Sequence, residues 1–213
     1  MKVNWVEGSG FDSNIFLIRD DLSLLIDAGT GLNFDQVEKE IERAGIKLEG
    51  LDILVNTHCH YDHVGGDPDF LEISNCKFMT SEPTAKILGS GDEDTTLAKN
   101  FGGELKPLEV SQTLQENDQI KLGETTLQVL LTPGHTEGGI SLYEPHEKAL
   151  FSGDTVFSMG IGRIDLPTSD SKEMKNSLQK LAKLDVNKLY PGHGPIEEEN
   201  AEEAIQRGLN FLV

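Results

Sequence analysis

Short apolar segments recur along the chain, and most of them end at a turn that contains glycine. Their length and their apolar or alternating character are typical of β-strands. Asp20-Asp21 and Gly123-Glu124 interrupt two of the segments and predict hairpins. The predicted strands are residues 3–7, 14–26 (two strands), 51–57, 77–81, 118–131 (two strands), 140–143, 149–151 and 188–190.

Apolar residues at helical spacing predict longer helices between and after these strands. Asn33 and Gln36 have the spacing of a capping box at the start of the first helix. Residues 169–171 cap the second helix, and a third runs from about Glu197. Two shorter features complete the pattern: a short helix at residues 83–88, and a polar surface loop at residues 89–103, for which a substrate-covering loop is the alternative.

Strands dominate both halves of the chain, and each half also contains helices. This order suits an α/β (α+β) sandwich of sheets with helices packed outside. The 213 residues, of which 37% are hydrophobic, are enough for one sizeable core. We therefore expect a single domain that spans residues 1–213.

The composition of the chain limits the kinds of partner and the compartment that we expect. A formal net charge of −19 repels phosphate backbones, so no nucleic-acid partner is expected. Two cysteines are too few for a disulfide framework. The N-terminal residues do not resemble a signal peptide, and no apolar run approaches the ~20 residues of a membrane span. The cytoplasm is the expected compartment, and oligomeric state is left open.

The segment His58-Cys59-His60-Tyr61-Asp62-His63 concentrates more metal ligands than any other part of the chain. If the preceding strand continues through it, His58 and His60 project from the same side and can bind one ion. Cys59 then points away and is read as a small buried residue rather than a ligand or nucleophile. A turn at Asp62 lets Asp62 and His63 serve a neighbouring ion. Imidazole and carboxylate ligands suit zinc, and also iron or manganese.

Three later residues share one context, in which a strand is followed by glycine and a ligand. They are His135 in Pro-Gly-His-Thr, Asp154 in Ser-Gly-Asp-Thr and His193 in Pro-Gly-His-Gly. His146 lacks this context and is expected on the surface. Asp27 also ends a strand, and we expect it to orient a ligand or the backbone rather than to bind metal.

These motifs together resemble those of the metallo-β-lactamase superfamily. Residues 57–66, THCHYDHVGG, resemble its first motif, and the three later motifs follow in the family's order. The resemblance implies a four-layer αββα sandwich with a dinuclear site at one edge. It also implies a ligand set: His58, His60 and His135 for one metal, Asp62, His63 and His193 for the second, and Asp154 as the bridge.

The motifs also indicate which branch of this superfamily the chain resembles. Aspartate at position 154 departs from class B β-lactamases, which usually have cysteine there, and His60 departs from the flavodiiron pattern. Residues 157–170 resemble short glyoxalase II-like members, related to hydroxyacylglutathione hydrolase. Full-length members carry a C-terminal helical domain that helps to hold glutathione, whereas this chain ends soon after His193.

The resemblance implies metal-assisted hydrolysis of a thioester or related ester-like bond. Two ions, expected to be Zn²⁺, share a water and lower its pKa, and the hydroxide attacks the carbonyl of a small-molecule acyl-thiol or ester. Asp62 is expected to orient this hydroxide. Arg163 is a candidate contact for an anionic substrate group, with an ion pair to Asp165 as the alternative.

Three other functions stay open at the level of sequence. A persulfide dioxygenase would use one iron on the same fold, and a lactonase or a metal-dependent nuclease would use the same ligands. The complete second-metal set argues against the first, and the negative charge argues against the nuclease. The sequence contains no G-x-S-x-G elbow, no Walker A loop and no H-E-x-x-H motif.

Overall fold

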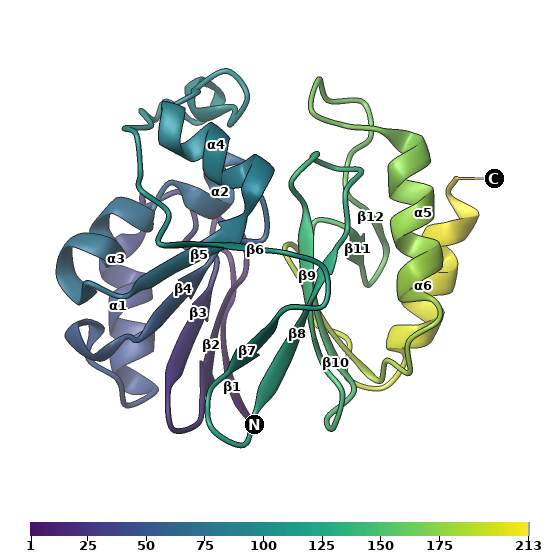
Figure 1. Cartoon of the computed structure of the whole chain (residues 1–213), viewed down its shortest axis with the longest axis horizontal. Helices are drawn as coiled ribbons and strands as arrows, with labels where there is room; N and C mark the ends of the chain where they lie inside the picture. The colour runs from purple at the N-terminus through teal and green to yellow at the C-terminus, as the bar shows by residue number, and fades with distance from the viewer. Residues whose placement is uncertain (213) are drawn as a thin grey trace.

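Two β-sheets face each other in the centre of the computed structural model, with helices on both outer sides (Figure 1). The structure describes residues 1–212. The first sheet consists, in spatial order, of β1 (Lys2–Val6), β2 (Ile15–Arg19), β3 (Ser23–Ile26), β4 (Ile53–Val55), β5 (Lys77–Ser81) and β6 (Gln112–Leu114). The second consists of β13 (Lys188–Pro191), β10 (Ala149–Gly153), β9 (Ile140–Glu144), β8 (Thr126–Leu131) and β7 (Gln119–Lys121).

Three apolar layers hold the sandwich together. Side chains such as Phe16, Val55 and Leu142 fill the space between the sheets. A second cluster joins the outer face of the first sheet to α1 (Phe34–Arg43) and α3 (Asp67–Ser74), and a third joins the second sheet to α5 (Ser171–Leu181) and α6 (Ala201–Asn210). The order is therefore helix, sheet, sheet, helix, which confirms the expected αββα architecture.

Several shorter elements lie at one edge of the sandwich, at the top in Figure 1. They include α2 (Tyr61–Val64) and α4 (Glu82–Ser90), whereas the small hairpin of β11 (Val156–Phe157) and β12 (Gly160–Ile161) packs against α6. The 3-10 turns are Leu48–Gly50 and Ala98–Phe101. Within residues 1–212, no helix has both the length and the apolar character that a bilayer crossing requires.

One predicted helix start and one predicted helix cap differ from the structure. The last helix begins at Ala201 rather than near Glu197, because the backbone of Glu197 pairs with Leu189 in a β-bridge. Asn33 does precede α1, but its side chain makes no capping hydrogen bond. Its amide instead donates to Asp12 Oδ2 at 2.7 Å, which ties α1 to the loop between β1 and β2.

Candidate metal centre

The first ligand segment leaves the strand before the histidines begin. β4 ends at Val55, and residues 56–60 form an irregular loop, so the alternation argument for His58 and His60 was wrong. The two rings nevertheless approach each other, with centroids 4.9 Å apart. The loop curves them toward the same space, and Cys59 between them is buried, as expected.

Asp62 and His63 lie on the short helix α2, which begins directly after His60. Successive helical residues are about 100° apart around the axis, so these neighbours point in different directions while remaining at one site. His63 is fully buried, and Asp62 keeps part of its carboxylate open to solvent. The expected turn at this point is therefore a helical one.

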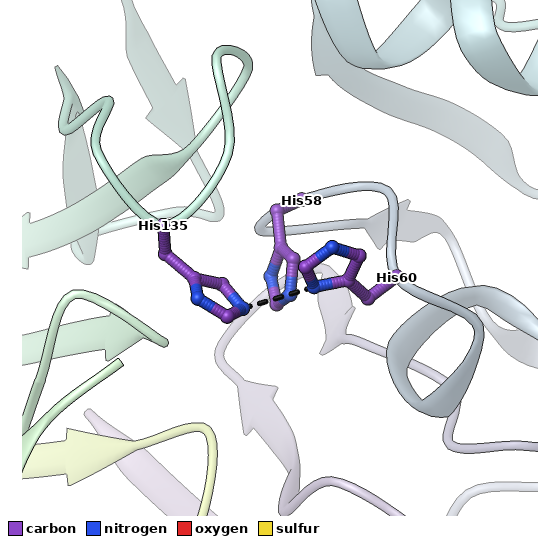
Figure 2. Close-up of side chains that lie close together, drawn as sticks. All are labelled: His58, His60 and His135. Atoms are coloured by element: carbon purple, nitrogen blue, oxygen red, sulfur yellow. Dashed lines mark hydrogen bonds between the residues drawn. The ribbon is translucent and has the colours of Figure 1, made fainter. Parts of the chain in front are cut away.

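The second sheet supplies the other three candidates. His135 lies in the loop after β8, Asp154 directly follows β10, and His193 follows β13 through Gly192. Figure 2 shows His135 reaching from the opposite side of the edge toward His58 and His60. The His58 and His135 ring centroids are 5.0 Å apart, and those of His60 and His135 are 4.6 Å apart.

All seven predicted metal-binding side chains thus meet at one edge of the sandwich. Their ligand atoms form three overlapping groups, and within each group these atoms lie within 4.8 Å of one another. The groups are His58, His60 and His135; His58, His63 and Asp154; and Asp62, His63 and His193. His146 is exposed, as expected, and belongs to none of these groups.

Asp154 lies between the two halves of this cluster. Its Oδ1 is 3.3 Å from His63 Nε2, and its Oδ2 is 3.5 Å from His135 Nε2 and 3.7 Å from His193 Nε2. Burial alone raises the pKa of Asp154, but His63 and the other two histidines outweigh it and hold the pKa well below its usual range. The carboxylate is therefore ionised and faces both groups.

Asp27 orients one histidine in each half. Its Oδ2 accepts from His63 Nδ1 at 2.8 Å and from Thr57 Oγ1 at 2.8 Å. Because that hydroxyl hydrogen is used, Thr57 Oγ1 accepts from His58 Nδ1 at 3.1 Å. The contacts match the expected orienting role of Asp27 and turn the Nε2 atoms of His58 and His63 inward.

Two partners that the sequence did not reveal orient the rings of His135 and His60. The backbone oxygen of Arg163 accepts from His135 Nδ1 at 2.9 Å. Thr168 Oγ1 lies 3.2 Å from His60 Nε2 and can donate to the His135 carbonyl, so it accepts from His60. A backbone oxygen and a lone threonine carry no motif, so no sequence pattern could have identified them.

These partners leave bare nitrogen lone pairs that face one another. His60 Nδ1 and His135 Nε2 are 2.9 Å apart. Neither nitrogen carries a proton, because each ring donates its one N–H from its other nitrogen to the partner just described. Burial first, and then the neighbouring His135, lowers the pKa of His60 to about 3, so a proton does not bridge the pair at neutral pH. His58 Nε2 is buried and has no hydrogen-bond partner among the described residues. A cation resolves both features, so the donor set fits a metal ion.

A pocket of about 300 Å³ opens over these ligands. His60, Asp62, His135, Asp154 and His193 contribute to its floor, and apolar side chains such as Leu97 and Phe157 contribute to its walls. Arg163 also lines it, although its guanidinium is largely exposed and forms a two-point ion pair with Asp165 at 2.9 Å. Arg163 thus lies where it could contact a substrate, and it also forms the ion pair with Asp165 that was the alternative role.

Comparisons with known proteins agree with this fold and cluster. A family model of the metallo-β-lactamase superfamily matches residues 8–193. A probable metallo-hydrolase of Methanocaldococcus jannaschii is 39% identical over 205 residues, which cover 94% of this chain and 95% of that protein. The chain belongs to the metallo-β-lactamase superfamily.

Relatives with more specific descriptions are also similar. An acyl-coenzyme A thioesterase of Gallus gallus is 33% identical, over 96% of this chain and 79% of that protein. A hydroxyacylglutathione hydrolase of Bartonella tribocorum is 39% identical over 64% of this chain, but the match spans only 46% of that protein. The similarity agrees with the predicted glyoxalase II-like branch.

One solved structure shares both the fold and nearly the full length. It is described as a di-iron-bound form, has a TM-score of 0.78 and 29% sequence identity, and covers 95% of this chain and 97% of that one.

Proposed function

We propose that the protein is a hydrolase of thioesters that uses two divalent metal ions. His58, His60 and His135 hold the first ion, Asp62, His63 and His193 hold the second, and Asp154 lies between them. The observation that carries this proposal is the pair of opposed, unprotonated nitrogens on His60 and His135 beside a complete second group. Zn²⁺ is the proposed metal, with iron the first competitor.

The two ions, when bound, lower the pKa of a water toward ~7 and polarise the substrate carbonyl. The residues of the chain provide the rest. Burial raises the pKa of Asp62, but His63 and a hydrogen bond from His193 outweigh it and keep the pKa below its usual value. Asp62 is therefore an ionised acceptor at the pocket floor, where it can orient the attacking water through its hydrogen.

The reaction adds water across the C–S bond and gives a carboxylic acid and a thiol. A thiolate is a stable leaving group, so the pocket needs no strong general acid. Arg163 can then bind an anionic group on the thiol, although its pair with Asp165 must first open. Two of the relatives carry thioester-hydrolase descriptions, which supports this substrate class over lactones or RNA.

The test combines metal analysis with turnover. Purified protein should bind two ions per chain and hydrolyse S-lactoylglutathione or acyl-coenzyme A, whereas His60→Ala and Asp154→Ala should lose metal and at least a thousandfold in kcat/KM, an order of magnitude typical of removing essential groups. His146→Ala is the matched control and should change neither. Retention of metal and turnover by both site variants would disprove the assignment.

The competing dioxygenase makes a different prediction in the same experiment. It would bind one iron and consume oxygen with a persulfide substrate. The complete group of Asp62, His63 and His193 argues against a single-metal site, since all three ligand atoms converge. One iron per chain with oxygen uptake and no thioester turnover would replace the proposal.

A further inference from the structure

A second cavity of about 410 Å³ adjoins the metal pocket. Two of its lining residues are direct chain neighbours of metal-site histidines, namely Cys59 beside His60 and Thr136 beside His135. A third, Thr168, contacts His60 Nε2. The cavity therefore lies beside the His60 and His135 side of the cluster, and its size is within the ~300–1,000 Å³ of typical ligand pockets.

Leu97 lines both spaces, which therefore meet at this residue. Its backbone has φ +62°, a left-handed conformation that leucine rarely adopts. The segment around it is held in place by contacts with the ligand helix, since the backbone N–H of Tyr61 donates to the Thr96 oxygen at 2.8 Å. Leu97 is thus held beside α2, and the segment at residues 89–103 forms part of the site rather than a free surface loop.

The chemistry of this second cavity differs from that of the metal pocket. Ile87, Leu97 and Pro167 give it walls that are mostly apolar. Its only charged lining residues among the described part of the chain, Asp94 and Glu137, are both acidic. Asp94 is already paired with Lys99 at 2.7 Å. The cavity therefore favours a neutral apolar group and disfavours an anion, whereas Arg163 lies on the metal-pocket side.

We propose that this second cavity binds the acyl chain of the thioester, and that the substrates are thioesters of neutral, apolar acyl groups several carbons long. The proposal rests on the proposed function for the thioester itself. It fixes the direction in which the substrate lies: the carbonyl over the metal cluster, the acyl chain past Leu97, and the thiol toward Arg163.

The first test is a series of acyl thioesters of N-acetylcysteamine with metal-loaded protein. From acetyl through butyryl to hexanoyl, kcat/KM should rise about fourfold per added methylene, because each buried CH₂ contributes ~0.8 kcal/mol. The succinyl thioester has the same number of acyl carbons as butyryl but ends in a carboxylate, and it should be at least tenfold poorer. A flat series, with succinyl equal to butyryl, would overturn the proposal while leaving the thioesterase function intact.

The second test fills the cavity from a position that does not line the metal pocket. Ile87→Trp should lower kcat/KM for the hexanoyl thioester at least tenfold and leave the acetyl thioester within twofold. Ile87→Phe, a smaller insertion, should give an intermediate loss and serves if the tryptophan variant does not fold. Ile73→Trp, on the exposed part of α3, is the matched control. Equal losses for acetyl and hexanoyl substrates would contradict the assignment of the cavity.

A binding measurement separates this inference from the proposed function. The thioether S-hexyl-N-acetylcysteamine cannot be hydrolysed, and calorimetry should show it binding at least tenfold more tightly than the S-methyl compound, with the difference lost in Ile87→Trp. That result without turnover of any thioester would support the apolar cavity and disprove the thioesterase. Equal binding of both thioethers would disprove the cavity assignment.

Discussion

At the scale of single residues, Asp27 links the two halves of the metal cluster through one carboxylate oxygen. It accepts from His63 directly and acts on His58 through Thr57. Its backbone is left-handed, with φ +61°, which asparagine tolerates. A change to asparagine therefore alters the hydrogen bonds and leaves the backbone in place.

We predict that Asp27→Asn weakens metal binding by about 10–100-fold, the usual cost of losing a partner that orients a ligand. The ion at His63 should be affected more, because His63 loses a direct contact. Competitive titration against a chromophoric chelator measures both affinities. Asp12→Asn is a matched control, since Asp12 is also buried but bonds to Thr30 and not to a histidine. Equal affinities in the wild type and Asp27→Asn would contradict the role.

The histidines also differ in how strongly they hold protons. Burial lowers the pKa of His63, but Asp154, Asp27 and Asp62 outweigh it and raise the pKa well above its ordinary value. Burial and the nearby His135 lower the pKa of His60 to about 3. A metal ion at His63 must therefore displace a proton at neutral pH, whereas an ion at His60 meets no such competition until the solution is strongly acidic.

It follows that the two ions should leave in a fixed order as pH falls. As pH falls from neutral, the proton that His63 holds strongly should release the ion shared with Asp62 and His193, and the ion at His58, His60 and His135 should remain. Elemental analysis after gel filtration at each pH checks this. Loss of the His60-bound ion first, or of both ions together, would show that the assumed proton competition is wrong.

At the scale of elements, Gly192 brings β13 very close to the cluster. A Cβ at this position would lie 2.2 Å from Asp154 Oδ1 and 2.8 Å from His63 Cε1. Only glycine, which has no side chain, lets the end of β13 come close enough for His193 to lie beside Asp154 and His63. Gly194, two residues further, has φ +76° but open space around it.

These two glycines make a matched pair. Gly192→Ala should displace Asp154 or His63 and abolish binding of at least one ion, while the fold persists because the clash is confined to the site. Gly194→Ala should keep both ions and cost only ~1 kcal/mol of unfolding free energy for its left-handed backbone. Metal content and thermal melting separate the cases. Two bound ions in Gly192→Ala would refute the argument.

The sequence correctly predicted the elements whose apolar pattern was long or was bounded on both sides by polar or turn residues. The strand at residues 77–81 was predicted with its observed ends, and both long hairpins were found. The helix α3 and the short strands β6, β11 and β12 were not predicted, because they are brief and lack a clear period. The start of α6 was misplaced because the bridge between Glu197 and Leu189 is a tertiary contact.

In the candidate site, too, some features were predictable from the sequence and others were not. The ligand types and their order were visible in four motifs, because metal chemistry restricts them to histidine and aspartate. The positions of the ligands in space were not visible, because His58 and His60 lie in an irregular loop and not on a strand. The second cavity depends on residues from five separate segments, none of which carries a pattern of its own.

At the scale of the whole molecule, the cluster joins the two halves of the sandwich. His58, His60, Asp62 and His63 follow β4 of the first sheet, and the other three ligands follow strands of the second. Ions bound there should favour the folded state. At a free concentration 100-fold above Kd an ion contributes ~2.7 kcal/mol.

Removal of both ions, at ~2.7 kcal/mol each, should therefore lower the melting temperature by about 10–20 °C, given ~2–4 °C per kcal/mol for a chain of this size. Differential scanning calorimetry before and after dialysis against a chelator measures the shift. In His60→Ala the same treatment should have a much smaller effect, whereas His146→Ala should behave as the wild type. An unchanged melting temperature in the wild type would indicate that the ions do not bind across the sheets.

The two sheets are also consecutive along the chain. All strands of the first end by Leu114, all strands of the second begin at Gln119, and each half holds an incomplete set of ligands. A gene divided between codons 116 and 117 would encode two polypeptides that share one interior and one set of metal ligands. We expect the two to reassociate when mixed, and more tightly when zinc is added, as co-purification with and without zinc would show. In this protein the metal would then serve as a reversible molecular connector.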